Sequence, residues 1–443
     1  MKPYVAGVDS STQSVKIVIM DPITGQVVRE GRACHPQGTE VDPTYWWEAF
    51  LTAVEEASGL DDVRAISFGG QQHGMVCLDK NGEVIRPALL WNDTRSAQAG
   101  KDLVKELGSG DEALGVKEWV YRTGSVPVAS ITITKLRWLA DHEPDNAAKI
   151  AAVCLPHDWL SWKFSGSTRL EDLATDRSDA SGTGYFKTPS ADQSYDYSLL
   201  ARALRISEAE AHKIQLPRVA APTEVIGHGD ADHGWNHIAI GPGCGDNAGA
   251  ALGLKLSPGE AMLSLGTSGV VALRSDKPVV DPEGIITGFA DATGQWLPLA
   301  CTLNASRIID AMAAVLGVDY ELFSELALSV DSAKGLELTP YFEGERTPNL
   351  PDATASLTGM TLENCRPAYV ARASVEGLLS LMRGAMDAMR SAGAEVNKVQ
   401  MVGGGAKLEA VRVLAPDILG VEVEVPEASE YVALGAARQA AMI

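Results

Sequence analysis

Residues 4–20 of the chain read YVAGVDSSTQSVKIVIM: an apolar run, a turn of small hydroxyl side chains, and a second apolar run. Residues 262–273 repeat the pattern as MLSLGTSGVVAL, with Thr267 in the place of Thr12 and Val270 in the place of Val15. Short apolar runs bounded by turn residues predict buried strands. The recurrence therefore predicts two related domains, each with one strand–turn–strand unit.

The elements around the first turn indicate the fold class. A further short strand is expected over 26–29, an amphipathic helix over 43–58 and a buried strand over 63–68. Three strands, a helix and another strand are the order of a ribonuclease-H-like domain with a mixed sheet, and alternating strands and helices indicate an α/β protein. We expect two such domains, spanning 1–236 and 237–443.

Two further patterns concern loops. Asn81-Gly82 lies between the apolar runs 75–78 and 84–85, which predicts a two-residue β-hairpin. Residues 227–237 are polar and rich in Gly and His, the composition of a linker, so we place the domain junction there.

Composition limits the possible partners. The 443 residues include 37 Lys and Arg against 58 Asp and Glu, a formal net charge of −21. Nucleic acids and anionic membranes attract basic surfaces, so neither is an expected partner. Six widely spaced cysteines suggest neither a zinc site nor a disulfide framework, and a reducing cytoplasm is the expected location.

Both hydroxyl turns suit a phosphate group. Small residues allow backbone N–H groups to approach phosphate oxygens, and hydroxyl groups add donors without charge. An ordinary tight hairpin would explain either turn alone, but two matched turns favour phosphate binding. Neither turn contains a lysine, which excludes a P-loop. The residues concerned are Ser11, Thr12 and Gln13 in the first turn and Gly266, Thr267 and Ser268 in the second.

Two aspartates stand at strand ends. Asp9 ends the first apolar run, where a carboxylate could hold Mg²⁺ bridging phosphate oxygens or, alternatively, form an Asx turn. Asp246 follows a Gly-rich turn and opens a helix of small residues. That position suits a partly desolvated general base for a hydroxyl group, and it equally suits a plain helix N-cap.

Three polar or Gly-rich segments complete the candidate site. Gln72 and His73 follow the strand over 63–68 and are possible hydrogen-bond partners for a polyol, although a lone His is more often structural. Residues 91–95, which begin with Trp91 and include Asp93, are typical of a sugar site or of a polar loop. Bare backbone over 403–406 could accept an adenine or a ribose, or form a simple turn.

In their order along the chain these residues resemble the FGGY family of carbohydrate kinases, and within it the xylulokinases. Residues 130–142 are similar to the first signature of the family, and residues 357–376 to the second. The segments most similar to xylulokinases are 72–74, 90–93, 245–248, 263–269, 344–348 and 403–406. The first turn departs from the family pattern, with Ser11 and Ser14 where Gly is usual.

The resemblance implies a role for each candidate residue. Asp246 would be the catalytic base, and Asp9 would organise Mg²⁺. The expected sugar-binding residues are Gln72, His73, Trp91, Asp93 and Asn247. The expected ATP-binding residues are Ser11, Thr12, Gln13, Gly266, Thr267, Ser268, Gly403, Gly404, Gly405 and Ala406. The family implies two domains of the actin-like ATPase fold that flank a deep cleft.

The expected activity is therefore ATP-dependent phosphorylation of D-xylulose to D-xylulose 5-phosphate, with ATP and Mg²⁺ as cofactors. Another ketose or polyol, such as ribulose, gluconate or glycerol, is the first alternative. A non-enzymatic, actin-like nucleotide-binding module is the second alternative, but such a module would not require Asp246 or the polar groups at 72–73 and 91–95. A homodimer in the cytoplasm is expected by analogy with the family.

Overall fold

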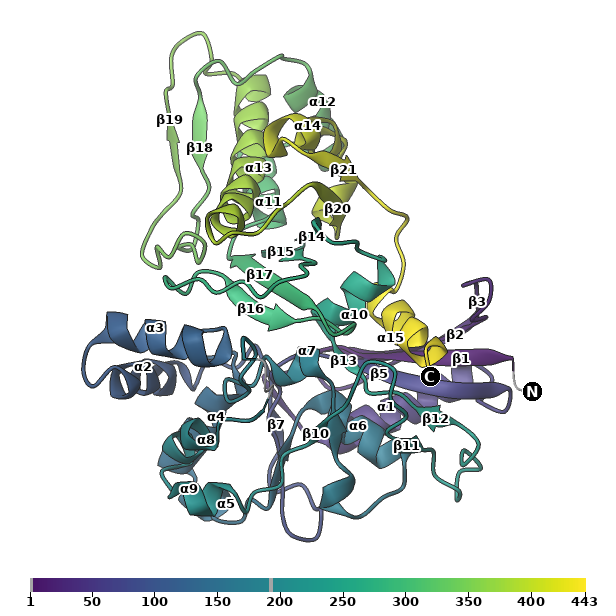
Figure 1. Ribbon diagram of the computed structural model, residues 1–443. Helices are drawn as coiled ribbons and strands as arrows, with labels where there is room; N and C mark the ends of the chain where they lie inside the picture. The colour runs from purple at the N-terminus through teal and green to yellow at the C-terminus, as the bar shows by residue number, and fades with distance from the viewer. Residues whose placement is uncertain (1–2, 191–193) are drawn as a thin grey trace. The chain divides into compact units, whose positions relative to one another are not determined.

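The computed structural model describes residues 3–190 and 194–443 (Figure 1). The chain forms two compact units, each of α/β architecture. Unit 1 comprises Met1–Lys255, Gly288–Leu297 and Glu430–Ile443. Unit 2 comprises Leu256–Thr287 and Pro298–Ser429.

Unit 1 is built on a mixed seven-stranded sheet. Its order is β11-β12-β5-β1-β2-β3, and β13 also pairs with β5. Strands β1, β2 and β3 pair antiparallel, whereas β5 runs parallel to β1, so the predicted ribonuclease-H-like order is confirmed. The bounds are β1 Tyr4–Ser10, β2 Ser14–Met20, β3 Val27–Cys34, β5 Val63–Gly70, β11 Gly227–His228, β12 Ala239–Ile240 and β13 Cys244–Gly245.

Side chains on β1 and β2 alternate between two apolar faces, as a period of two requires. Val8 and Ile17 share one cluster with Phe50 of helix α1 (Pro43–Glu56), whose predicted position is confirmed. Val5 and Val18 point to the other face and pack with Ala433 and Ala437 of helix α15 (Tyr431–Ala441). The sheet of unit 1 is thus buried on both sides.

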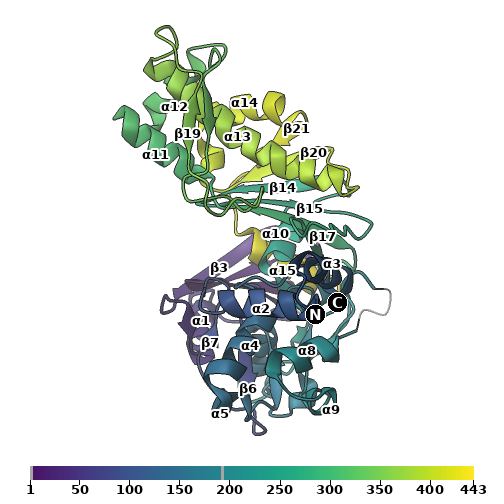
Figure 2. The ribbon, with the colours of Figure 1, turned by 90° about the vertical axis from the view of Figure 1, so that its left-hand side faces the viewer.

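Helix α15 approaches its neighbours more closely than a side chain would permit. A Cβ at Gly7 of β1 would stand 2.0 Å from the carbonyl oxygen of Ala433. A Cβ at Gly435 would stand 1.9 Å from the carbonyl oxygen of Gly249 in helix α10 (Asp246–Gly253). Helices α10 and α15 accordingly lie side by side (Figure 1 and Figure 2). Both glycines are therefore required for this packing.

The remaining elements of unit 1 are short. They are β4 Glu40–Val41, β6 Val76–Leu78, β7 Ala88–Leu89, α2 Ala97–Leu107, α3 Glu112–Thr123, α4 Thr132–His142, α5 Pro144–Ala147, β8 Ala152–Cys154, α6 Pro156–Phe164, η1 Leu170–Asp172, β9 Ala174–Thr175, α7 Arg177–Ala180, α8 Tyr197–Leu204, α9 Glu208–Ala211 and β10 Arg218–Val219.

The structure bears on two sequence predictions about loops. The predicted hairpin forms, since Leu78 and Val84 make an antiparallel bridge and the backbone N–H groups of Asp79 and Ile85 donate to the carbonyl oxygens of Glu83 and Cys77, although its turn is longer than two residues. Strand β6 also pairs with β8. The expected linker over 227–237 packs into unit 1 instead. There β11 pairs with β12, and Trp235 stacks on Phe164 with ring centroids 4.8 Å apart. The expected boundary at 236/237 consequently falls inside unit 1, which continues to Lys255 before the chain enters unit 2.

The sheet of the second half has the order β16-β17-β15-β14-β20-β21. Strands β14, β15 and β17 pair antiparallel, β20 runs parallel to β14, and β21 runs parallel to β20. Strands β14, β15, β17, β20 and β21 therefore correspond to β1, β2, β3, β5 and β12. They have the same neighbours and the same relative directions, as the predicted duplication requires. The bounds are β14 Glu260–Leu265, β15 Gly269–Leu273, β16 Thr287–Ala290, β17 Trp296–Thr302, β20 Lys398–Val402 and β21 Glu422–Glu424.

The core of unit 2 surrounds helix α13, in which Leu378 and Met382 pack with Leu263 and Val271 of the sheet. None of the described helices combines the length and the apolar character that crossing a membrane requires. The other elements of unit 2 are α11 Ser306–Leu316, α12 Tyr320–Leu328, β18 Glu337–Thr339, β19 Ser356–Thr358, α13 Pro367–Ser391, η2 Gly405–Lys407 and α14 Glu409–Leu419.

We expect Gly7→Ala to destabilise the protein by about 3 kcal/mol, the upper end for overpacking a core, because the new methyl group would overlap the backbone of α15. Gly384→Ala is the matched control. Gly384 lies in α13, and a Cβ there would meet no atom within 4 Å, so the same change should stabilise the helix by up to about 1 kcal/mol. Thermal unfolding midpoints compare the two variants. A Gly7→Ala midpoint at or above that of the parent protein would contradict the packing argument.

Candidate active site

Asp9 is a buried carboxylate near the end of β1, only 5% exposed. Its Oδ2 lies 3.7 Å from Nζ of Lys16, which also pairs with Glu430 at 2.5 Å. Burial raises the pKa of Asp9 to about 6, against the opposing effect of Lys16. Its Oδ1 has no hydrogen-bond partner among the described residues, so the alternative of an Asx turn is wrong.

An unsatisfied buried carboxylate oxygen fits the chemistry of a hard divalent cation. Within 3–190 and 194–443, no group of three or more His, Cys, Asp or Glu side chains is arranged to hold a metal ion. Mg²⁺ does not need such a cage, because it keeps several waters and is usually held by one or two carboxylates together with substrate phosphates. Asp9 therefore fits a Mg²⁺ ion that arrives with a nucleotide.

Asp246 opens helix α10, whose N-cap is Gly245, so the alternative that Asp246 is itself the N-cap is wrong. Its Oδ1 accepts hydrogen bonds from the backbone N of Asn247 at 2.7 Å and from Asn247 Nδ2 at 3.0 Å. Burial raises the pKa of Asp246 to about 7, and repulsion from Asp179 and Asp9 adds to this effect. A carboxylate that titrates near neutral pH is suited to accept a proton from a hydroxyl group.

Gln72 and His73 lie just beyond β5. Gln72 Oε1 accepts a hydrogen bond from Asn247 Nδ2 at 3.1 Å, which joins two expected sugar-binding residues to Asp246. His73 adopts a φ of +69°, and its Nδ1 lies 2.8 Å from the carbonyl oxygen of Gly182. The His73 ring also packs against Phe289, with centroids 5.6 Å apart. The structure thus brings Gln72, Asn247 and Asp246 into one hydrogen-bonded group.

Trp91 and Asp93 occupy different environments. Trp91 is 46% exposed, and its Nε1 donates a hydrogen bond to Thr12 Oγ1 at 2.9 Å. Asp93 is buried and accepts hydrogen bonds from the backbone N and Nε of Arg95. Burial alone would raise the pKa of Asp93, but hydrogen bonds from Thr39 and Arg95 hold it below its usual value. Asp93 is therefore engaged in shaping its own loop, whereas Trp91 meets the first hydroxyl turn.

The two hydroxyl turns are both hairpin turns, but they differ in length. Ser10 pairs with Val15, which leaves four residues in the first turn, 11–14. Leu265 pairs with Gly269, which leaves three residues in the second turn, 266–268. Within unit 2, the carbonyl groups of Gly266 and Thr267 accept hydrogen bonds from the backbone N of Ser306 and Ala305. The second turn is thereby fixed to the start of α11.

The segment 403–406 follows β20 and belongs to the same part of unit 2 as the second turn. Gly403 has a φ of +92°, and its Cβ would stand 2.7 Å from the carbonyl oxygen of Leu265. Gly405 and Ala406 enter the short helix η2, and nothing lies within 4 Å of a Cβ at Gly404. Bare backbone at Gly404 therefore adjoins the second hydroxyl turn.

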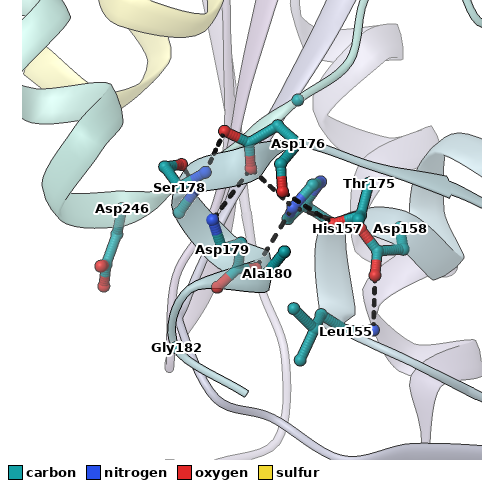
Figure 3. A network of polar contacts seen from close by, with 12 residues as sticks. Leu155, His157, Asp158, Thr175, Asp176, Ser178, Asp179, Ala180, Gly182 and Asp246 are labelled. Atoms are coloured by element: carbon teal, nitrogen blue, oxygen red, sulfur yellow. Dashed lines mark hydrogen bonds and ion pairs between the residues drawn. The ribbon is translucent and has the colours of Figure 1, made fainter. Parts of the chain in front are cut away.

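Sequence reasoning missed a buried polar network in unit 1 (Figure 3). His157 Nε2 lies 3.3 Å from Asp158, 3.6 Å from Asp176 and 3.2 Å from Asp179. Burial alone would lower the pKa of His157, but the three carboxylates together raise it to about 9. Burial raises the pKa of Asp158 to about 7 and that of Asp176 to about 6. Three carboxyl groups within 3.6 Å of one imidazole nitrogen favour the protonated form of His157.

The sequence does contain a signal for this network. Residues 176–183 read DRSDASGT, a segment with two aspartates that directly follows strand β9. His157 and Asp158 lie in the first turn of α6, after β8 has ended at Cys154. Polar residues near strand ends were the criterion that identified Asp9 and Gln72, and the same criterion would have selected Asp176 and Asp179.

Comparison with known proteins identifies the class of protein to which the chain belongs. The model for the N-terminal domain of the FGGY family of carbohydrate kinases matches residues 4–253, and the model for its C-terminal domain matches residues 261–443. The chain belongs to the FGGY family of carbohydrate kinases and is an ATP-dependent enzyme of that class.

Individual relatives point to one branch of this family. The xylulose kinase of Streptomyces coelicolor is 42% identical, over 99% of this chain and 88% of its own length. The xylulose kinase of Haemophilus influenzae is 31% identical, over 98% of this chain and 89% of its own. The crystal structure of xylulose kinase from Bifidobacterium adolescentis superposes with a TM-score of 0.95 at 49% identity, covering 100% of this chain and 92% of that one.

The raised pKa of Asp246 predicts a stability effect. Between about pH 4 and pH 7, the carboxyl group of Asp246 is neutral in the folded protein and charged in the unfolded chain, so folding takes up a proton. The free energy of unfolding therefore decreases as the pH rises through this range. Asp246→Asn keeps an acceptor for Asn247 and removes the charge. At pH 8 it should be more stable than the parent protein, by at most about 4 kcal/mol, and the difference should vanish near pH 4.

Thermal unfolding at pH 4, 6 and 8 measures this effect. Asp352→Asn, at an exposed surface position, is the control and should change the midpoint little at any pH. If Asp246→Asn unfolded at a lower temperature than the parent protein at pH 8, the burial argument for Asp246 would be wrong.

Proposed function

We propose that the protein transfers the terminal phosphoryl group of ATP to the terminal hydroxyl group of D-xylulose, which yields D-xylulose 5-phosphate. The observation that carries the proposal is the hydrogen-bonded group of Asp246, Asn247 and Gln72, in which the carboxylate titrates near pH 7. The choice of sugar is supported by the relatives named xylulose kinase, at 42% and 49% identity over nearly the whole chain.

On the sugar side, Asp246 accepts the proton of the attacking hydroxyl group. Its hydrogen bonds from Asn247 fix the orientation of the carboxylate, so the acceptor oxygen needs little reorganisation during the reaction. Gln72, Asn247 and His73 present amide and imidazole groups that hold the hydroxyl groups of the sugar. Trp91 supplies an exposed aromatic face next to Thr12, and Asp93 fixes the loop that carries it.

On the phosphate side, backbone N–H groups and hydroxyl groups take the place of lysines. We assign Ser11, Thr12 and Gln13 in unit 1, and Gly266, Thr267 and Ser268 in unit 2, to the phosphates of ATP. Gly403, Gly404, Gly405 and Ala406 are assigned to its nucleoside. Asp9 would hold Mg²⁺, which supplies charge compensation at the phosphate oxygens when bound. Phosphoryl transfer requires mainly positioning and such compensation, and these groups provide both.

The activity is tested by measuring sugar-stimulated ADP release with a panel of D-xylulose, D-ribulose, L-ribulose, gluconate and glycerol. We expect D-xylulose to give the highest kcat/KM. A different preferred substrate would keep the enzyme class and overturn the sugar assignment. ATP turnover indifferent to every sugar would instead favour a nucleotide-dependent binding module.

Asp246→Asn should lower kcat with D-xylulose by about 10²- to 10⁴-fold, the range typical for loss of a general base. ATP affinity should be retained, because we assign Asp246 to the sugar side. In the parent enzyme the ionised carboxylate is the active form, so kcat/KM should rise with pH and level off above about pH 7. Steady-state kinetics from pH 5.5 to 9 and a nucleotide-binding titration check both expectations. Near-normal turnover in the variant would remove Asp246 from the mechanism.

His73→Asn tests the sugar contact without straining the backbone, because Asn tolerates the positive φ at this position better than Ala does. We expect the KM for the sugar to rise at least about tenfold, the equivalent of one lost hydrogen bond, with the KM for ATP within twofold. His212→Asn, at an exposed histidine of unit 1, should leave both constants unchanged. Equal increases in both KM values would argue against a specific role for His73 in sugar binding.

A cytoplasmic location stays a prediction from the cysteine pattern, and a homodimer stays a prediction from the family resemblance. Light scattering at several protein concentrations tests the homodimer.

A further inference from the structure

His157 fills a space that two glycines leave open. A Cβ at Gly70 would stand 3.1 Å from Cβ of His157, and a Cβ at Gly243 would stand 2.4 Å from its Nδ1. Gly70 ends β5, directly before Gln71, Gln72 and His73. Gly243 directly precedes β13, which leads into Asp246. The buried imidazole is therefore packed between the two strand ends that deliver the sugar-binding and proton-accepting residues.

The segment 176–182 connects the imidazole to both strand ends. The carboxylate of Asp179 lies 3.2 Å from Nε2 of His157, and the carbonyl oxygen of Gly182, in the same segment, lies 2.8 Å from Nδ1 of His73. Ser178 Oγ accepts the backbone N–H of Gly245 at 3.1 Å. Asp176 caps α7 by accepting the backbone N–H groups of Ser178 and Asp179, which fixes this short helix (Figure 3). One segment thus contacts His73 on one side of the candidate site and the backbone before Asp246 on the other.

This arrangement favours a buried cation. Asp158 on α6, Asp176 before α7 and Asp179 on α7 are each at most 3% exposed, and all three face the same imidazole. Unpaired buried carboxylates are strongly unfavourable, and like charges at this spacing repel one another. Without the cation, Asp179 would take up a proton or move toward solvent, and the segment that contacts His73 through Gly182 would shift with it.

We propose that His157 is a positioning residue of the kinase: a buried cation that holds the 176–182 segment and, through it, sets the places of His73 and Asp246. This inference rests on the proposed function, because it assigns a role in the same sugar site. It predicts that the charge of residue 157, rather than its shape, is what the site requires.

Two substitutions at residue 157 separate charge from shape. His157→Gln keeps a polar, uncharged side chain, and His157→Lys restores a cation with a different shape. We expect His157→Gln to lower kcat/KM for the sugar by about 100-fold, the effect of a displacement of about 1 Å at a reacting group, with ATP affinity within twofold of the parent enzyme. His157→Lys should recover at least tenfold of that loss. Unchanged sugar kinetics in folded His157→Gln, or a Lys variant no better than the Gln variant, would overturn the proposal.

Two carboxylates on the same imidazole provide a matched comparison. Asp179→Ala and Asp158→Ala each remove one charge partner of His157. They differ in the element that carries the carboxylate. Asp179 lies in α7, in the segment that contacts His73 through Gly182, whereas Asp158 lies in α6 and accepts the backbone N–H of Leu155. We expect Asp179→Ala to lower kcat/KM for the sugar at least tenfold more than Asp158→Ala. Equal losses would mean that the network serves stability alone.

Thermal unfolding of every variant separates loss of folding from loss of positioning. If His157→Gln does not fold, the comparison between the two carboxylates decides the question. The outcome also distinguishes this inference from the proposed function. A parent protein that phosphorylates no member of the sugar panel refutes the proposed function, whereas an active parent enzyme with an unaffected, folded His157→Gln variant refutes only the positioning role.

Discussion

The close approach of helix α15 to strand β1 is the constraint on which unit 1 depends. It exists because Gly7 and Gly435 carry no side chain where the backbones meet. The helix covers the face of the sheet opposite α1, so it completes the core beneath the candidate site. The same approach places Glu430, directly before α15, against Lys16 and thus next to Asp9. The contact between α15 and β1 therefore determines both the packing of the core and the charges next to Asp9, the proposed Mg²⁺ ligand.

Buried carboxylates dominate the electrostatics of unit 1. Asp9 and Asp246 both titrate well above the usual range for aspartate because each is desolvated, and they repel one another. Lys16 forms an ion pair with Asp9, and His157 balances a separate group of three aspartates. A protein of net charge −21 thus places further negative charge where a polyphosphate is expected. Such a site favours ligands that bring their own divalent cation.

The fold was largely predictable because its signals are local. Apolar runs marked β1, β2 and β5, and the repeated hydroxyl turn marked the second sheet. The hairpin around Asn81 was predictable from its local turn signal, whereas the pairing of β6 with β8 joins distant segments and has no local signal. The packing of α15 on β1 joins residues more than 400 positions apart, and no local pattern encodes that contact.

The candidate site likewise contains some residues that the sequence could indicate and others whose role depends on the fold. Asp9, Gln72 and Asp246 were selected because polar residues directly follow strand ends, whereas His157 matters only through the carboxylates that the fold gathers around it. The sugar-binding role of Asp93 stays a prediction. The structure adds that its carboxylate accepts hydrogen bonds from the backbone N and Nε of Arg95, which the sequence pattern of this polar loop did not indicate.

The position of α15 in the sequence has a consequence for biosynthesis. Residues 256–429, apart from the segment Gly288–Leu297, form unit 2, so the ribosome must translate all of unit 2 before the helix that covers Val5, Val18 and Ala65 emerges. Until then, one apolar face of the first sheet stays open to solvent or to other nascent chains. Exposed apolar strands of this kind are the usual targets of chaperones and the usual origin of aggregation. Completion of unit 1 is therefore a late event, even though its strands are made first.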